Sequence, residues 1–95
     1  MKLFGIIAAK QYRKDYKRLL KSGFDMEKLE DVIDRLASDE QLDPRHHDHA
    51  LQGRMRQTRE CHIGPDWLLR YAKNDKTLVL LLISTGDHRH VLGIE

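Results

Sequence analysis

The second half of the chain contains, at residues 57–85, the stretch QTRECHIGPDWLLRYAKNDKTLVLLLIST. Turn-forming residues divide this stretch into three short segments, first at 64–66 (GPD) and again at 74–75 (ND). The last segment is apolar at every position over 78–83, which is typical of a strand whose two faces are both covered. The stretch therefore predicts three consecutive antiparallel strands, over 57–63, 67–73 and 77–85.

Upstream of this stretch, the first elements are a short strand and a helix. Residues 3–7 form an apolar run without a helical period, which predicts a strand paired in the middle of the sheet. A helix is expected next, ending at Gly23, because glycine readily adopts the left-handed conformation that closes a helix. Its predicted apolar face has helical spacing and consists of Tyr12, Tyr16, Leu19 and Leu20.

A second helix is predicted to begin after Asp25, whose side chain can cap it, and to stop before Pro44. Asp31 and Arg35 can pair one turn apart on its outer surface. The apolar stripe consists of Met26, Leu29, Val32, Ile33 and Leu36. The expected fold is α+β, with a hairpin of two N-terminal helices packed on a four-stranded antiparallel sheet, in the order strand-helix-helix-strand-strand-strand.

The composition describes one soluble domain over residues 1–95, with 40% hydrophobic and 34% charged residues. Cys61 is the only cysteine, which excludes an internal disulfide framework and fits a reducing cytoplasm. The apolar run near the N-terminus is interrupted by Lys10, so it is interpreted as a strand and no association with a membrane is expected. The formal net charge of +2 is too small to indicate a nucleic-acid partner by itself.

Four side chains at predicted strand ends and turns could carry out chemistry: His49, His62, Asp66 and His88. Histidine changes charge near neutral pH, so imidazoles around one cleft can supply both a base and an acid without a metal. RNA carries its own nucleophile, the 2′-hydroxyl. A nearby cation would stabilise the charge that develops on phosphorus. This set of residues is therefore compatible with cleavage of a phosphodiester in RNA.

Each of these residues also has a purely structural interpretation. His49 taken alone is a loop histidine, Asp66 makes the usual hydrogen bonds of a turn, and Trp67 and Tyr71 share one face of a strand as core aromatics. The run RHHDH at 45–49 suggests a metal site, but adjacent histidines diverge in an extended chain. The sequence contains neither a phosphate-binding glycine loop nor a metal-binding motif, so neither a nucleotide nor a metal cofactor is expected.

Three blocks of sequence, in order, resemble the signature blocks of YafQ-type toxins in the RelE/ParE toxin–antitoxin superfamily. The blocks are DHALQG at 48–53, RECHIGPDWLLRY at 59–71 and TGDH at 85–88. The GFD turn at 23–25 and the LDP step at 42–44 also match, so the resemblance spans nearly the whole chain. The ordered combination is specific, whereas any single block such as PDW would be weak.

The resemblance implies a RelE-like fold. It also implies a ribosome-dependent mRNA endoribonuclease that inhibits translation in the cytoplasm, with a cognate antitoxin, the ribosome and mRNA as partners. His49, His62, Asp66 and His88 match the acid/base positions, and His88 is the leading candidate for the general acid. Trp67 matches a position that shapes the site and contacts RNA, because an aromatic face can stack on an unpaired base.

Two positions depart from the family pattern. Ser84 stands where family members usually carry an arginine, and Leu92 stands where an aromatic residue is common. Loss of a transition-state donor typically costs on the order of 3 kcal/mol, so reduced activity is expected unless another cation replaces it. Arg89 is the first candidate because it adjoins His88, and Arg56 and Arg70 are the others expected to contact RNA.

Two other functions remain open at this stage. A catalytically silent RelE-fold protein could bind the antitoxin or the ribosome without cutting RNA, and the change at Ser84 favours this reading. A ParE-like inhibitor of DNA gyrase would share the fold but would need no acid/base set. The three histidines and Asp66 of the matched blocks argue against the gyrase inhibitor.

Overall fold

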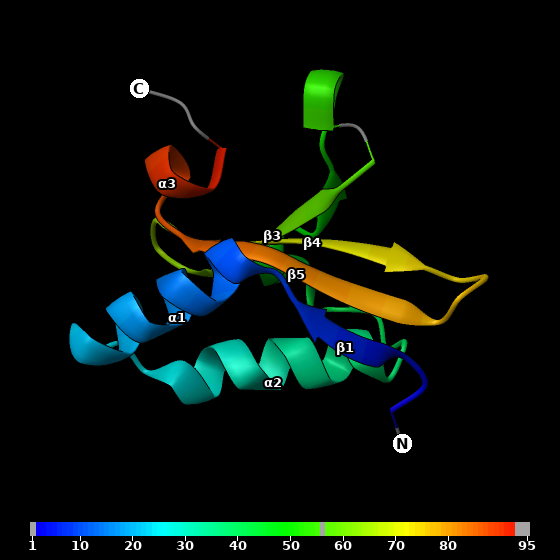
Figure 1. The fold of residues 1–95 in the computed structure, drawn as a ribbon, viewed down its shortest axis with the longest axis horizontal. Coiled ribbons are helices and arrows are strands. Elements are labelled where there is room, and N and C mark those ends of the chain that lie inside the picture. Colours follow the sequence, from blue (N-terminus) through cyan, green and yellow to red (C-terminus); the bar gives the residue numbers. More distant parts are fainter. Residues whose placement is uncertain (1, 56, 93–95) are drawn as a thin grey trace.

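The computed structural model describes residues 2–55 and 57–92. Its strands form one sheet in the order β1-β5-β4-β3-β2, and helices α1 and α2 cover one face of that sheet (Figure 1). The elements are β1 (Gly5–Ala8), α1 (Lys10–Lys21), α2 (Met26–Ala37), η1 (Pro44–His46), β2 (His49–Ala50), η2 (Gly53–Met55), β3 (Arg59–Gly64), β4 (Trp67–Asn74), β5 (Val79–Gly86) and α3 (His88–Leu92). No helix within the described residues is long and apolar enough to cross a membrane.

The predicted α+β class is confirmed, but the sheet formed by the described residues has five strands and is mixed. β3, β4 and β5 are antiparallel neighbours, as expected, whereas β1 runs parallel to β5. The additional strand is the two-residue β2, which pairs with the start of β3. Composition does not encode the direction of β1, because parallel pairing depends on the path by which the chain connects β1 to its distant partner β5.

The expectation that residues 3–7 form a central strand was wrong. β1 pairs with β5 alone and lies at the edge of the sheet, so Ile7 is 53% exposed and Ile6 is also exposed. A short apolar run predicts a strand without showing how many neighbours that strand has. β5 has a neighbour on each side, but only Leu80 and Leu82 of its apolar run are buried, while Leu81 on the other face is half-buried.

The predicted helix ends agree with the structure. α1 ends at Lys21, and Gly23 has a φ of 82°, so its N–H can bond the carbonyl oxygen of Leu20 at 3.2 Å. The side chain of Asp25 accepts a hydrogen bond from the N–H of Glu27 and caps α2. These local signals were readable because each involves residues close together in sequence.

The buried face of α1 differs from the prediction at two positions. Leu20 is 55% exposed, whereas Asp15 is 1% exposed and faces the sheet. Tyr12 and Leu19 are buried, as predicted. Leu20 lies about 100° around the helix from Leu19, which turns it away from the sheet.

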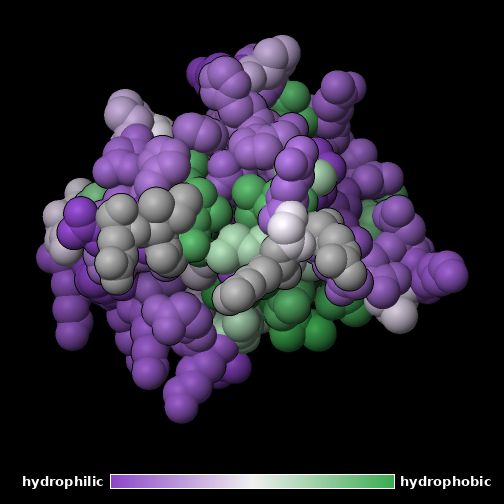
Figure 2. All heavy atoms as spheres, turned by 90° about the horizontal axis from the view of Figure 1, so that it is seen from above, coloured by the Kyte–Doolittle hydropathy of each residue, from purple (hydrophilic) through white to green (hydrophobic). Residues whose placement is uncertain are grey.

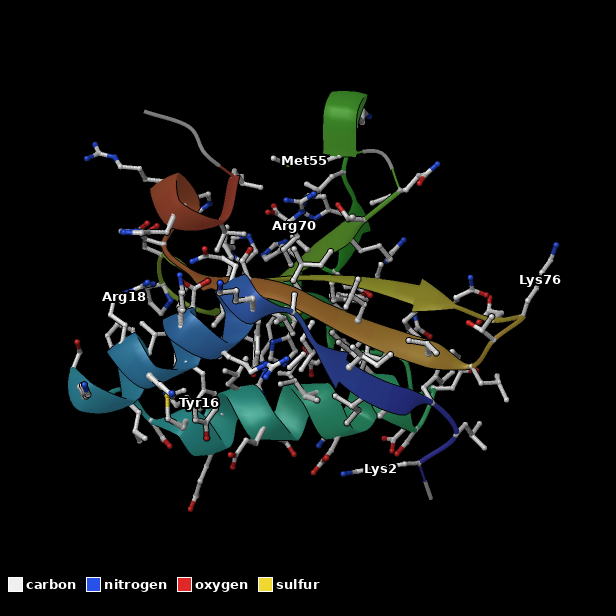
Figure 3. All side chains as sticks on the ribbon, in the orientation of Figure 1. Lys2, Tyr16, Arg18, Met55, Arg70 and Lys76 are labelled. Carbon is white, nitrogen blue, oxygen red and sulfur yellow. The ribbon has the colours of Figure 1, made fainter. Side chains whose placement is uncertain are left out.

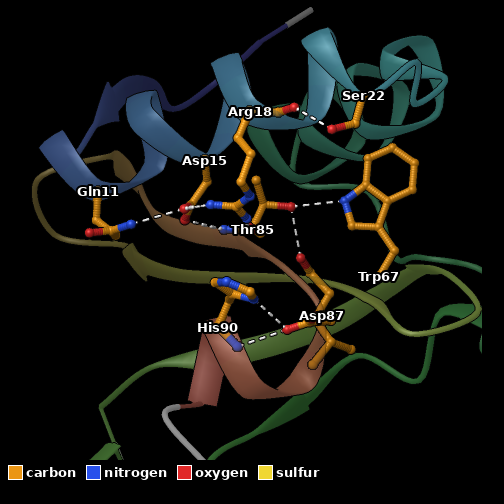
Figure 4. A network of polar contacts seen from close by, with 9 residues as sticks. Gln11, Asp15, Arg18, Ser22, Trp67, Thr85, Asp87 and His90 are labelled. Atoms are coloured by element: carbon orange, nitrogen blue, oxygen red, sulfur yellow. Dashed lines mark hydrogen bonds and ion pairs between the residues drawn. The ribbon is translucent and has the colours of Figure 1, made fainter.

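Asp15 is buried with three hydrogen bonds to its carboxylate, one of which joins α1 to β5 (Figure 4). It accepts from Gln11 Nε2 at 2.9 Å, from Arg18 Nη1 at 2.8 Å and from the backbone N–H of Thr85 at 3.1 Å. The hydroxyl of Thr85 accepts a hydrogen bond from Trp67 Nε1 at 3.0 Å. This polar network fixes the end of β5 against α1, directly before the turn that carries His88.

Candidate active site

The face of the sheet opposite α1 and α2, called the open face below, carries a group of histidines. His62 on β3 is directly paired with Leu68 on β4, so both side chains point to this face. Leu68 is buried but lies outside the core formed with the helices, where Leu69 and Tyr71 are found. Seen from this side, the surface is mostly hydrophilic (Figure 2).

His62 and His88 come together on the open face, with ring centroids 5.8 Å apart. His88 begins α3, and its imidazole Nδ1 lies 2.7 Å from Asp66 Oδ1. The same oxygen accepts the backbone N–H of His88 at 3.2 Å. These hydrogen bonds from His88, first that of its ring, lower the pKa of Asp66. An ionised Asp66 thus holds Nδ1 as a donor and leaves Nε2 available to a substrate.

Burial lowers the pKa of His62 from its ordinary value. The negative charge of Glu60 acts in the opposite direction, but its effect on this pKa is smaller. The ring of His47 lies 5.4 Å from that of His62, and Nδ1 of the buried His46 lies 2.7 Å from the carbonyl oxygen of His62. The His47 ring is thus an aromatic neighbour of His62 in addition to His88. The contact from His46 holds the backbone of β3 in place. His62 is therefore a neutral imidazole at pH 7, able to accept a proton.

His49 lies on β2 directly opposite Glu60 of β3. Its Nδ1 is 2.6 Å from the carbonyl oxygen of His47, and its Nε2 is 3.0 Å from Glu60 Oε1. A neutral imidazole has one N–H, so these two contacts require an additional proton on His49 or on Glu60. Sequence reasoning missed Glu60, although its position two residues before His62 places both on the open face.

The predicted RNA contact at Trp67 is not supported by its surroundings. Trp67 is 6% exposed, and its indole N–H is bound to Thr85 beneath the sheet. Its ring packs edge-on against Phe24 at 5.0 Å between centroids. The structure places Trp67 with Tyr71 in the core, because alternate residues of β4 face the helices.

The three arginines named from the sequence have different surroundings. Arg56 lies outside the described residues. Arg89 is exposed on α3, one residue beyond His88. Arg70 is half-buried on β4 and is directly paired with Ser84 of β5. The other departure from the family pattern, Leu92, lies half-buried at the end of α3.

A groove of about 490 Å³ adjoins His62, between α2, η1 and the end of β3. Lys28 and Arg45 line it and give it positive charge, and Asp31 is the acidic residue among the described residues that line it. A polar, cationic groove beside the imidazoles suits a phosphate backbone. Over residues 2–55 and 57–92, no three histidine, cysteine, aspartate or glutamate side chains are grouped as metal ligands.

The turn that positions His88 depends on Gly86. Gly86 has a φ of 148°, and a Cβ built there would lie 2.8 Å from Arg18 Nη2. We expect Gly86→Ala to destabilise the protein by about 1–3 kcal/mol through backbone strain, and to displace His88 and lower RNA cleavage. Thermal unfolding and a cleavage assay measure both effects.

Gly53→Ala is the matched control, because Gly53 also has a positive φ of 68° but a Cβ there meets nothing within 4 Å. It should lose stability through strain alone and keep its rate of cleavage. A Gly86→Ala variant that unfolds and cleaves like Gly53→Ala would contradict the positioning role of this turn.

Comparisons with known proteins agree on one family. The model of the family described as "Bacterial toxin of type II toxin-antitoxin system, YafQ" matches residues 5–93. The mRNA interferase toxin YafQ of Escherichia coli strain K12 is 37% identical over 84 residues, which cover 87% of this chain and 89% of that protein.

Solved structures of related toxins resemble this chain both in sequence and in fold. A metal-bound toxin from Helicobacter pylori is 38% identical and superposes with a TM-score of 0.87, covering 93% of this chain and 98% of that one. YafQ in the E. coli DinJ-YafQ toxin-antitoxin complex is 34% identical with a TM-score of 0.86, covering 96% and 99%. The matches in sequence and in fold extend over nearly the whole chain, and the chain belongs to the YafQ family of bacterial type II toxins.

Proposed function

We propose that this chain is the toxin of a type II toxin–antitoxin system and acts as an mRNA interferase, an endoribonuclease that cuts messenger RNA on the ribosome. The observation that carries the proposal is the meeting of His62 with the Asp66-bound His88 on the open face. An acid and a base that face one space are what cleavage of RNA by its own 2′-hydroxyl requires. The mRNA interferases among its relatives support the choice of substrate.

In the proposed reaction the neutral His62 removes the proton of a 2′-hydroxyl, and the 2′-oxygen attacks the adjacent phosphorus. The bond from phosphorus to the 5′-oxygen breaks, and His88 Nε2 gives a proton to the departing oxygen. The products are a 2′,3′-cyclic phosphate and a 5′-hydroxyl, with no net change in protons. Asp66 holds the His88 ring in place throughout, through its bond to Nδ1.

The partners follow from the same family relationship. A cognate antitoxin is proposed to bind the toxin, as DinJ binds YafQ in the E. coli toxin-antitoxin complex. The site of action is proposed to be the cytoplasm, where messenger RNA and ribosomes meet. The groove beside His62, with Lys28 and Arg45, is the proposed path for the RNA backbone.

The lowered pKa of His62 gives cleavage a defined pH dependence. His62 acts as a base only when neutral, so we expect cleavage to persist below the ordinary histidine value of 6.5 and to fall as the pH drops through the lowered pKa. Single-turnover rates from pH 5 to pH 8 measure this limb, and His62→Gln should flatten it. An acidic limb that persists in His62→Gln would assign the titration to another group.

Protonation of His62 should also weaken the fold, since the folded state binds this proton less tightly than the unfolded state does. Its contribution to stability is present above pH 6.5 and is lost as the pH falls toward the lowered pKa. The free energy of unfolding should therefore decline less in His62→Gln than in the unchanged protein over this interval.

A catalytically silent binding module is the second candidate, and Ser84 favours it. A serine cannot supply the positive charge that stabilises the transition state. Addition of the purified protein to a cell-free translation reaction separates the candidates, with the length of the message read by primer extension. Shortened messages support the nuclease, and intact messages with halted synthesis support the binding module. Loss of gyrase supercoiling activity would instead support a ParE-like function.

A further inference from the structure

We propose that Arg70 supplies the positive charge that stabilises phosphorus during cleavage, a role that rests on the proposed function. Attack by the 2′-oxygen adds negative charge to the phosphate, and a fixed cation lowers the barrier to that step. His62 and His88 are engaged in proton transfer, and Ser84 is uncharged. The cation must therefore come from another side chain that reaches the open face.

The register of the sheet places Arg70 on that face. Arg70 is two residues from Leu68, the direct partner of His62, so it lies on the same face about 7 Å further along β4. Its direct partner on β3 is Glu60, which holds His49. Figure 3 shows Arg70 on the side of the sheet away from α1 and α2. Arg70 therefore projects from the open face beside Glu60, on the strand next to the one that carries His62, and its Nε is turned toward Thr58.

A hydrogen bond fixes the orientation of the Arg70 guanidinium, and no ion pair within the described residues neutralises its charge. Its Nε donates to the hydroxyl of Thr58 at 3.1 Å, which leaves the two terminal nitrogens for a ligand. Glu60 pairs with His49, and no carboxylate of the described residues forms an ion pair with Arg70. An arginine that is half-buried and held at Nε is preorganised for bidentate contact with phosphate.

The other cations are less well placed. Arg89 adjoins His88 but points about 100° away from it around α3 and is exposed. Arg45 lines the groove beside His62 but is exposed on η1, whereas Arg70 is half-buried on a strand of the open face. Among the arginines of the described residues, Arg70 is the one that lies on the open face and on β4, the strand next to that of His62.

The role of Arg70 can be tested by moving the arginine from position 70 to position 84. Ser84 is paired directly with Arg70, so both side chains point to the open face from adjacent strands. Its hydroxyl is buried and has no hydrogen-bond partner within the described part of the chain, so a replacement would break no hydrogen bond of this side chain. An arginine at position 84 would present its guanidinium to the same region as Arg70 does.

The experiment compares single-turnover cleavage of messenger RNA on programmed ribosomes by Arg70→Gln, Arg70→Lys and the double variant Arg70→Gln/Ser84→Arg. We expect Arg70→Gln to lower the rate about 100-fold or more with ribosome binding little changed, and Arg70→Lys to retain part of the rate. The double variant should recover most of the loss. Lys76→Gln is the matched control, because Lys76 lies in the distant β4–β5 turn (Figure 3).

The outcomes separate this role from the proposed function. Cleavage by Arg70→Gln at the rate of the control, together with a loss in His88→Ala, would overturn the role of Arg70 alone. A loss in Arg70→Gln that Ser84→Arg fails to restore, in a variant that unfolds at a lower temperature, would assign Arg70 a structural role instead. Absence of cleavage by the unchanged protein would overturn the proposed function and this role with it.

Discussion

His88→Ala should lower the rate of mRNA cleavage by about 10²-fold to 10⁴-fold, the range that a general acid contributes. The ring centroid of His88 lies 5.8 Å from that of His62, and its Nδ1 is held by the carboxylate of Asp66. No other side chain of the described residues combines these two features. Without the His88 imidazole, the departing 5′-oxygen must take its proton from water. The rate at each pH, measured in single turnover, reports this step.

His90→Ala provides the matched control. His90 lies on the same short helix and forms the same kind of contact, from its Nδ1 to Asp87 Oδ1 at 2.7 Å. It has no part in the proposed proton transfers, so its removal should leave the rate within about twofold of the unchanged protein. Equal losses in the two variants would indicate that both act through the stability of α3 and would contradict the acid role of His88.

Asp15→Ala should have the largest effect on stability, a loss of about 3 kcal/mol in the free energy of unfolding. The substitution leaves the backbone N–H of Thr85 without its acceptor in the interior, and it removes the partner of Arg18. A loss of this size corresponds to a fall in melting temperature of about 12–24 °C for a domain of this length. Thermal unfolding followed by circular dichroism measures it.

Two further variants test the cause. Asp15→Asn retains an acceptor for the N–H of Thr85, so it should lose less stability than Asp15→Ala. Asp31→Ala makes the same change in an exposed ion pair with Arg35 on α2, where a loss below about 1 kcal/mol is expected. Similar losses in Asp15→Ala and Asp31→Ala would show that the buried network contributes no more than a surface pair.

The sequence predicted the elements whose signals are local. The Gly23 helix end and the Asp25 cap each depend on residues within a single turn of chain, and both are present. The ordered sequence blocks also selected His62, Asp66 and His88, which the fold brings together although 26 residues separate the first from the last. Their grouping was predicted by resemblance, because no periodicity in the chain connects them.

Features that depend on distant contacts were missed. Asp15 was not singled out from the sequence, because its burial depends on a hydrogen bond to Thr85, 70 residues further along the chain. The edge position of β1 depends on the parallel pairing with β5. The position of Arg70 opposite Ser84 required the register of β4 against β5, in which the pairing shifts between Arg70 and Tyr71.

The most direct test of the central claim is cleavage of a message that carries a single 2′-deoxynucleotide at the site where the protein cuts. The site is first mapped on programmed ribosomes by primer extension, and the modified and unmodified messages are then compared in single turnover. Because the 2′-hydroxyl is the proposed nucleophile, we expect the unmodified message to be cut and the deoxy message to stay intact at that site. Cutting of both messages at equal rates would contradict catalysis by the His62 and His88 pair as proposed.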